Sequence, residues 1–138
     1  MADKQALIDG LNEDLNLELE AILRYVYHAA SATGLLGHEL REMAKEDLAG
    51  ELVHASFLAD KIAALGGEPN INPRPPKKQK SAKDMLLEDV AAERAIAENY
   101  RKHIEMAEAL GEKGLVIKLE DILSDEVDHA DELERLAR

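Results

Sequence analysis

Glutamate and histidine side chains interrupt the apolar stripes of four long segments that have a helical period. Apolar residues recur every three or four positions over residues 4–32, 38–65, about 81–110 and 115–138. Because an amphipathic helix buries its apolar stripe against other helices, these segments predict an all-α protein, a four-helix bundle. Its core would contain the six residues that interrupt the stripes, namely Glu18, Glu51, His54, Glu93, Glu126 and His129.

The connections predict how the four helices follow one another. The breaks at 33–37 and 111–114 are short, so they predict two antiparallel helix pairs within a single domain, 1–138. Residues 66–82 are rich in Gly, Pro and Lys and cannot be helical. An extended link of that length reaches about 53 Å, whereas the preceding helix is about 40 Å long. The link therefore allows a crossover along the bundle and an up-down-down-up order, with an interfacial loop or a mobile tether as the alternative.

The six interrupting residues predict a metal site. Buried carboxylates need a compensating positive charge, and no Lys or Arg stands near them in the stripes. Two Glu-x-x-His motifs, at 51–54 and 126–129, place both of their side chains on one helix face. In each half of the chain the two Glu residues are 33 positions apart, and the halves repeat with a shift of 75. This repeat suits two metal ions.

Charge and ligand type narrow the choice of metal. Two divalent ions balance four carboxylates when both imidazoles are neutral. Carboxylates with a minority of imidazole suit iron or manganese, although zinc and copper would also bind such groups. The alternatives are solvated polar positions or structural ion pairs in an acidic bundle, and a purely structural bundle that metal only stabilises.

The same residues resemble a known family. Leu11-Asn12, Leu15, Glu18-Leu19, Ala21-Ile22 and Tyr25 are similar to the first helix of bacterioferritin, and Glu51-Leu52-Val53-His54-Ala55 to its second. Glu93 stands where the third helix has a ligand, and Asp125-Glu126-Val127-Asp128-His129 resembles the motif of the fourth. The chain thus resembles, over all four helices, a non-haem, bacterioferritin-like member of the ferritin superfamily.

This resemblance implies a ferritin-like bundle with a di-iron site. Glu51 and Glu126 would bridge two irons, Glu18 with His54 would cap one, and Glu93 with His129 would cap the other. The implied function is a ferroxidase that binds two Fe(II) per subunit and oxidises them with O2 or H2O2 in iron detoxification and storage. The alternative is a di-iron or manganese oxidase or peroxidase that acts on a substrate other than iron.

The chain departs from the family pattern at positions beside these ligands. Bacterioferritin binds haem through a Met after the second-helix Glu; Leu52 stands there, so we expect no haem. The family's Asp that supports the fourth-helix His is replaced by Gly50, so His129 needs another group or water. Asp125 remains a candidate partner for His54. Ile96 and the absence of Cys disfavour a rubrerythrin-type peroxidase.

Other polar residues allow more than one interpretation. Tyr25 and Tyr100 are either hydrogen-bond donors beside the metal or core tyrosines, and Tyr25 could also supply an electron. Asp47 either relays incoming iron or is an ordinary acidic residue. Three histidines lie off the ligand register, which predicts surface or interface positions without a metal role: His28, His38 and His103.

Composition bounds the partners and the location of the protein. The net charge of −12 disfavours nucleic acid, and we interpret the basic cluster as a solvated link rather than a DNA site: Arg74, Lys77, Lys78, Lys80 and Lys83. No apolar run is long enough to cross a membrane, and the N-terminus lacks a signal-peptide core, which predicts a cytoplasmic protein. A lone bundle would leave four apolar residues off the first stripe partly exposed, which predicts a homo-oligomer: Leu7, Leu17, Leu23 and Val26.

Overall fold

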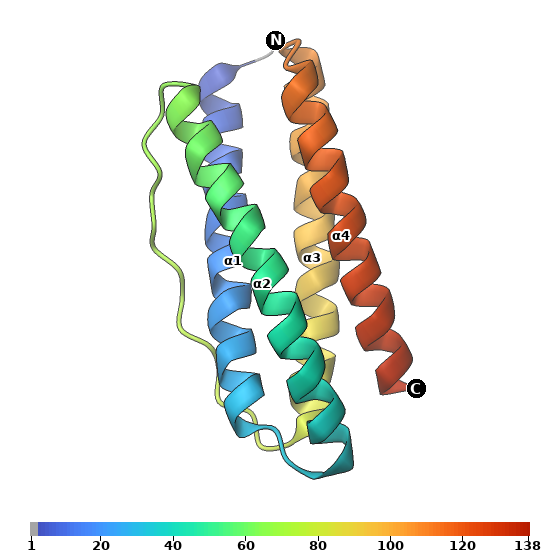
Figure 1. Cartoon of the computed structure of the whole chain (residues 1–138). Coiled ribbons are helices and arrows are strands. Elements are labelled where there is room, and N and C mark those ends of the chain that lie inside the picture. Colours follow the sequence, from blue (N-terminus) through green and yellow to red (C-terminus); the bar gives the residue numbers. More distant parts are fainter. Residues whose placement is uncertain (1–2) are drawn as a thin grey trace.

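The chain forms four long helices in its computed structural model, which describes residues 3–138 (Figure 1). They are α1 (Lys4–Ser31), α2 (Gly34–Ala64), α3 (Ala82–Ala109) and α4 (Lys113–Ala137). No strand occurs among these described residues, so the predicted all-α class is confirmed. Met1 and Ala2, which the predicted domain and the signal-peptide argument include, lie outside the described residues.

The helices have the up-down-down-up order that the connections predict. α1 packs most closely on α2, and α3 on α4, each pair being antiparallel (Figure 1). The segment between α2 and α3 runs along the outside of the bundle, from the end of α2 back to the other end of the molecule. As a result α3 is parallel to α2 and antiparallel to α1.

This segment, residues 65–81, is an ordered strap rather than a tether. Asn12, Asn16 and Glu20 follow one another at one-turn spacing on α1. Asn12 and Asn16 each hydrogen-bond to two alternate residues of the strap, and Glu20 bonds to Arg74. Four residues of helix rise about 6.0 Å, and two extended residues span about 6.2 Å, so the two repeats stay in register. The backbone groups bonded are Glu68 O, Asn70 N, Asn70 O, Asn72 N and Arg74 N.

Two helices begin earlier than the sequence predicts. α2 begins at Gly34, not at residue 38, because the glycines taken as a break allow a sharp corner. Gly34 has a φ of +80°, and a Cβ on Gly37 would lie 2.8 Å from the carbonyl carbon of Ala32. α4 begins at Lys113 rather than 115, since the left-handed φ of +72° at Gly111 completes the turn. By contrast, Ser81 caps α3 as predicted, and its Oγ accepts from the Asp84 N–H at 3.1 Å.

The buried apolar side chains of the bundle form two clusters, and the buried charged residues lie between and among them. The larger cluster includes the first half of α1 and the second half of α2, with residues such as Leu11, Leu15 and Leu58. The smaller cluster lies at the opposite end, around Leu40 and Leu86. The four buried glutamates lie between most of the larger cluster and the smaller one, whereas the buried residues Asp14 and His103 lie within the span of the larger cluster.

The apolar residues off the first stripe of α1 do not share one environment. Leu7 is fully buried, so its expected exposure is wrong; α1 contacts both α2 and α3, and its buried face is wider than one stripe. Leu17 is partly buried against the core. Leu23 and Val26 are exposed, as predicted.

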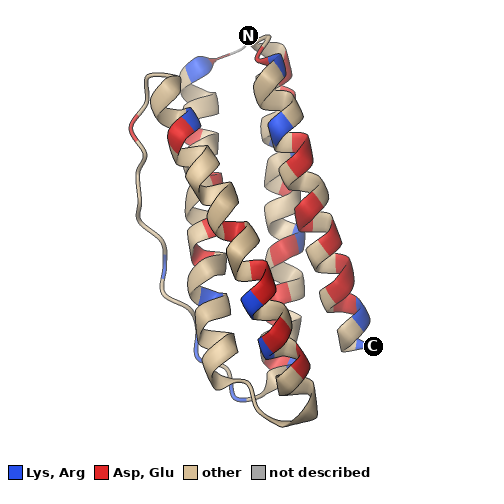
Figure 2. Cartoon of the chain, in the orientation of Figure 1, with Lys and Arg blue, Asp and Glu red and all other residues tan. Residues whose placement is uncertain are grey.

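Charges are unevenly distributed over the surface (Figure 2). Asp and Glu gather on α4 and on the first half of α2, whereas Lys and Arg mark the later part of the strap. Within residues 3–138, no helix is both long and apolar enough to cross a membrane.

Candidate metal centre

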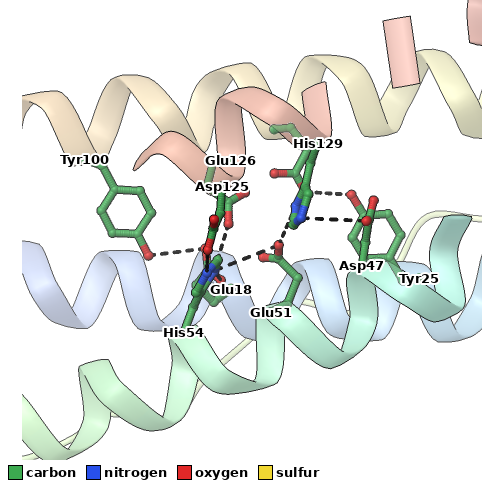
Figure 3. A network of polar contacts seen from close by, with 10 residues as sticks. Glu18, Tyr25, Asp47, Glu51, His54, Tyr100, Asp125, Glu126 and His129 are labelled. Carbon is green, nitrogen blue, oxygen red and sulfur yellow. Dashed lines mark hydrogen bonds and ion pairs between the residues drawn. The ribbon is translucent and has the colours of Figure 1, made fainter. Parts of the chain in front are cut away.

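The six residues that interrupt the apolar stripes converge in the middle of the bundle (Figure 3). α1 supplies one Glu, α3 another, and α2 and α4 each supply a Glu and a His three positions later, on the same helix face. All four Glu residues are 0% exposed. The residues that the structure brings together are Glu18, Glu51, His54, Glu93, Glu126 and His129.

These side chains form two overlapping groups, each with ligand atoms within 4.8 Å of one another. One group is Glu18, Glu51, His54 and Glu126; the other is Glu51, Glu93, Glu126 and His129. Glu51 and Glu126 belong to both groups. The arrangement therefore contains two positions, each with three carboxylates and one imidazole, that share two carboxylates.

Both histidines turn the same ring nitrogen toward the carboxylates. His54 Nδ1 lies 3.0 Å from Glu18 Oε2 and 3.0 Å from Glu126 Oε1. His129 Nδ1 lies 3.1 Å from Glu51 Oε1. A neutral imidazole that coordinates a metal uses an unprotonated nitrogen, so Nδ1 is the atom that each ring could offer.

The other nitrogen of each ring faces an Asp on the opposite helix. His54 Nε2 donates to Asp125 Oδ2 at 2.9 Å, which confirms the expected partner. His129 Nε2 lies 3.6 Å from Asp47 Oδ1. Asp47 is therefore more than an ordinary acidic residue of α2. Its carboxylate is the one that faces the His129 ring, to which Gly50 offers no side chain.

The two tyrosines join the layer as hydrogen-bond donors. Tyr25 donates to Glu93 Oε1 at 2.6 Å, and Tyr100 donates to Glu18 Oε1 at 3.2 Å. Both residues are fully buried. Each Tyr is therefore both a core residue and a hydrogen-bond donor, because its buried hydroxyl donates to a candidate ligand.

His28 and His103 are not surface residues, so that prediction is wrong. They are 0% and 2% exposed. His28 Nδ1 donates to Asp89 Oδ2 at 2.8 Å, and His103 Nδ1 donates to Asp14 Oδ2 at 2.6 Å. Arg24 Nε also donates to Asp89, at 2.8 Å. His38 is exposed, as predicted.

A sequence signal for these pairs exists. His28 and His103 are 75 residues apart, as are Asp14 and Asp89, which is the shift that relates the ligands. The two Tyr residues also obey this shift. Each half of the bundle therefore repeats one polar pattern, and each contact joins a residue of α1 to a residue of α3.

The buried carboxylates disfavour their charged forms. Burial, followed by the charge of Glu51, raises the pKa of Glu18 well above its usual range. Burial also raises the pKa of Glu93 and the pKa of Glu126, and contacts with Glu93 and Glu18 raise the pKa of Glu126 further. In the absence of bound cations, we therefore expect several of these carboxylates to be protonated.

Glu51 and His129 form the charged pair of the centre. Although burial raises the pKa of Glu51, the contact with His129 lowers it below its usual value. Burial lowers the pKa of His129, but Glu51 and the charge of Asp47 raise it to about 9. A metal ion must displace a proton from this ring.

The donor set fits a pair of cations. Within the part of the chain that the structure describes, both carboxylate oxygens of Glu51 and Glu126, one oxygen of Glu93 and Nδ1 of His129 are buried and make no well-aligned hydrogen bond, although Glu126 Oε1 and Glu51 Oε1 each lie close to a histidine nitrogen. Buried polar atoms are normally paired. Because these atoms are all acceptors once deprotonated, cations in the two positions would satisfy them together.

Comparisons with known proteins agree with this architecture. The model of the ferritin-like domain family, Ferritin, matches residues 8–138. Bacterioferritin of Brucella melitensis is 27% identical over 135 residues, which cover 97% of this chain and 84% of that protein. Bacterioferritin of Streptomyces coelicolor is 31% identical over 129 residues, covering 93% and 77% respectively.

Solved structures show the same likeness. The crystal structure of ferritin-like, diiron-carboxylate proteins from Bacillus anthracis has a TM-score of 0.95 and 37% identity, covering 100% of this chain and 99% of that one. The bacterioferritin of Desulfovibrio desulfuricans, whose diiron site was solved in different catalytic states, has a TM-score of 0.89 and 25% identity, covering 97% and 79%.

Proposed function

Because this chain belongs to the ferritin-like domain family, we propose that its six converging ligands bind two Fe(II) ions and that the protein is a ferroxidase. The oxidant would be O2 or H2O2, and the purpose would be iron detoxification and storage. The observation that carries the proposal is the pair of overlapping ligand groups, which share Glu51 and Glu126.

The ligand roles follow from the overlap. Glu51 and Glu126 would bridge the two ions, Glu18 and His54 would complete one position, and Glu93 and His129 the other. Four carboxylates and two neutral imidazoles balance two divalent ions, so the loaded centre would be close to neutral. Manganese or zinc could occupy the same oxygen and nitrogen donors.

The surrounding residues prepare the centre for this chemistry. Bound Fe(II) would supply the electrons that reduce the oxidant. Tyr25 and Tyr100 hold Glu93 and Glu18 by hydrogen bonds, which limits the orientations of these carboxylates. Asp125 holds His54 with Nδ1 toward the carboxylates. The buried apolar side chains that pack near the centre would limit the access of bulk water to the four glutamates.

Anaerobic titration tests the proposal. We expect two Fe(II) ions per chain, followed by rapid oxidation when O2 or H2O2 is added. Glu51→Ala should abolish both, because it removes a ligand common to the two positions. Glu120→Gln, an exposed carboxylate on α4, is the matched control and should keep both. Binding of fewer than two ions by the unaltered protein would contradict the proposal.

The same experiment separates the alternative function. A di-iron or manganese oxidase or peroxidase would also bind two ions, but it would turn over the oxidant with a substrate other than iron and would not consume added Fe(II). Haem is not expected, since the hydrocarbon side chain of Leu52 offers no ligand atom. A Soret band in protein supplied with haem would contradict that expectation.

A further inference from the structure

The two halves of the centre match in their ligands but not in the carboxylates behind the histidines. Each ligand of one half has a counterpart 75 residues away, and so do both tyrosines. The same shift relates Asp125 to Gly50, which has no side chain, and Asp47 to Ile122, which is apolar. The 75-residue repeat therefore fails at the carboxylates that face Nε2 of His54 and of His129.

Each histidine nevertheless faces one carboxylate of the opposite helix. Asp125 on α4 accepts from His54 Nε2 of α2 at 2.9 Å. Asp47 on α2 lies 3.6 Å from His129 Nε2 of α4. Since Gly50 cannot provide the counterpart of Asp125, a carboxylate three residues earlier on the same helix faces the ring.

We propose that Asp47 is the positioning residue of His129, in place of the carboxylate missing at Gly50, and that the two metal positions consequently differ in affinity. The position completed by His129 is the weaker one. This inference rests on the proposed function in one respect, that two ions bind.

Two observations explain the direction of the difference. A direct hydrogen bond between nitrogen and oxygen is about 2.7–3.2 Å long, so Asp125 holds His54 directly, while Asp47 holds His129 through a longer contact. The His129 ring is also more accessible, with 20% of its side chain exposed against 5% for His54. A less firmly held ring binds a metal more weakly, because binding must also fix its orientation.

Asp47 itself is sheltered and available for this role. Its side chain is 12% exposed, whereas that of Asp125 is 58% exposed. Oδ2 of Asp47 is buried and has no hydrogen-bond partner within residues 3–138. The carboxylate thus has no competing donor that would draw it away from His129.

Calorimetric titration with Co(II), which does not require anaerobic handling, measures the two positions. We expect two Co(II) ions per chain with unequal affinities. Asp47→Asn should weaken the weaker ion by about 10–100-fold and leave the tighter one unchanged, since outer partners of metal-bound histidines have effects of that size. Asp125→Asn should instead weaken the tighter ion. Glu46→Gln, which removes an exposed carboxylate next to Asp47, should change neither.

A rescue experiment tests positioning rather than general damage. A Cβ at Gly50 would meet only His129 Cε1, at 3.9 Å, which is an ordinary contact. Gly50→Asp in the Asp47→Asn background places a carboxylate where the repeat lacks one, and it should restore the lost affinity. In the Zn(II)-loaded protein, nitrogen NMR should show the His129 ring protonated at Nε2 in the unaltered and rescued proteins.

The outcomes separate this inference from the proposed function. Failure of the unaltered protein to bind two ions would overturn both. Two ions whose affinities Asp47→Asn leaves unchanged, or lowers equally, would overturn only the role of Asp47. Failure of Gly50→Asp to restore affinity in a variant with unaltered helicity would overturn the positioning argument.

Discussion

Glu126 occupies a core position where a simple bundle would have an apolar side chain. Burial and the neighbouring glutamates raise its pKa, so the metal-free protein must keep this carboxyl protonated at neutral pH. Protonation is unfavourable above the ordinary pKa of 4.5, at about 1.4 kcal/mol for each pH unit.

We therefore expect Glu126→Gln to stabilise the metal-free protein, by up to about 3 kcal/mol at pH 7. The gain should shrink to nearly zero at pH 4, where the carboxyl is protonated in both folded and unfolded chains. Urea unfolding in the presence of a chelator measures both values. The same variant should lose the binding of two ions, whereas Glu120→Gln should change neither stability nor binding. A variant no more stable than the parent at pH 7 would contradict the argument.

His103 and Asp14 form a buried pair whose partners depend on each other. Gly10 makes room for the ring, because a Cβ there would lie 2.7 Å from two ring atoms of His103. His103→Leu leaves the Asp14 carboxylate buried without this partner, which should lower the free energy of unfolding by about 3–5 kcal/mol. The double variant Asp14→Leu/His103→Leu should recover part of that loss. Strictly additive effects in the double-mutant cycle would show that the pair is not coupled.

At the residue level, the sequence placed the candidate ligands where a polar side chain interrupts an apolar stripe, and their role as ligands stays a prediction. All six candidate ligands stand in such positions, and the structure brings them together. The burial of His28 and His103 was not predicted. Each ring donates a hydrogen bond to an Asp of another helix, and the apolar stripe of a single helix cannot reveal such a contact. Comparing the halves at the 75-residue shift would have revealed both pairs.

The strap and α1 act together as one element. Asn16 connects them most densely: its side chain donates to Asn12 O and Asn70 O and accepts from the Asn72 N–H. Asn16→Ala should lower the free energy of unfolding by about 1–3 kcal/mol, since it removes three hydrogen bonds that are partly accessible to water. Hydrogen exchange at the Asn72 amide should accelerate more than exchange in the core of α3. An unchanged exchange rate at Asn72 would show that the strap is held by other contacts.

Sequence periodicity predicted the four helices, but not where two of them begin. Glycines at 34, 37 and 114 read as breaks because glycine disfavours a helix interior. In the structure Gly37, which has no Cβ, lets the backbone of α2 lie close to the backbone of Ala32, so α2 begins directly after the end of α1. Such an approach depends on two elements at once, so local preference alone could not place these boundaries.

At the scale of the whole molecule, the metal-free protein should become less stable as pH rises. Burial raises the pKa of Asp14 and Asp47 to about 6, and the carboxylates around His129 raise its pKa to about 9. A group with a raised pKa contributes stability that is complete below its unfolded value and lost as pH rises through its folded value.

We therefore expect the free energy of unfolding to fall between about pH 4 and pH 9 in the presence of a chelator. Added Fe(II) or Mn(II) should reverse the loss near neutral pH, because the ions replace the protons on the carboxylates. Thermal melting across that range checks both statements. Metal-free stability that does not depend on pH would contradict the burial of the centre.

Exposed apolar residues on the α1–α2 pair support the prediction of a homo-oligomer. Val26 and Leu52 are 52% and 57% exposed. If Val26 contacts a second copy of the chain, Val26→Asp should lower the mass measured by light scattering. Ile117→Asp, at a residue of α4 that is 50% exposed, is the matched control and should keep the mass. A monomeric parent protein would contradict the prediction.

The route of the strap determines which residues can meet between α1 and α3. Because the strap carries the chain to the end of the bundle where α2 begins, α1 and α3 run in opposite directions, and Tyr100 lies level with Glu18 while Tyr25 lies level with Glu93. If a tight turn joined α2 to α3, α3 would run parallel to α1. Each Tyr is seven residues from the Glu of its own helix, so with the two Glu residues level it would lie about 10 Å along the axis from the Glu of the other helix. An engineer who trimmed this connection would thus keep every amino acid of the centre and still separate each phenol from its acid.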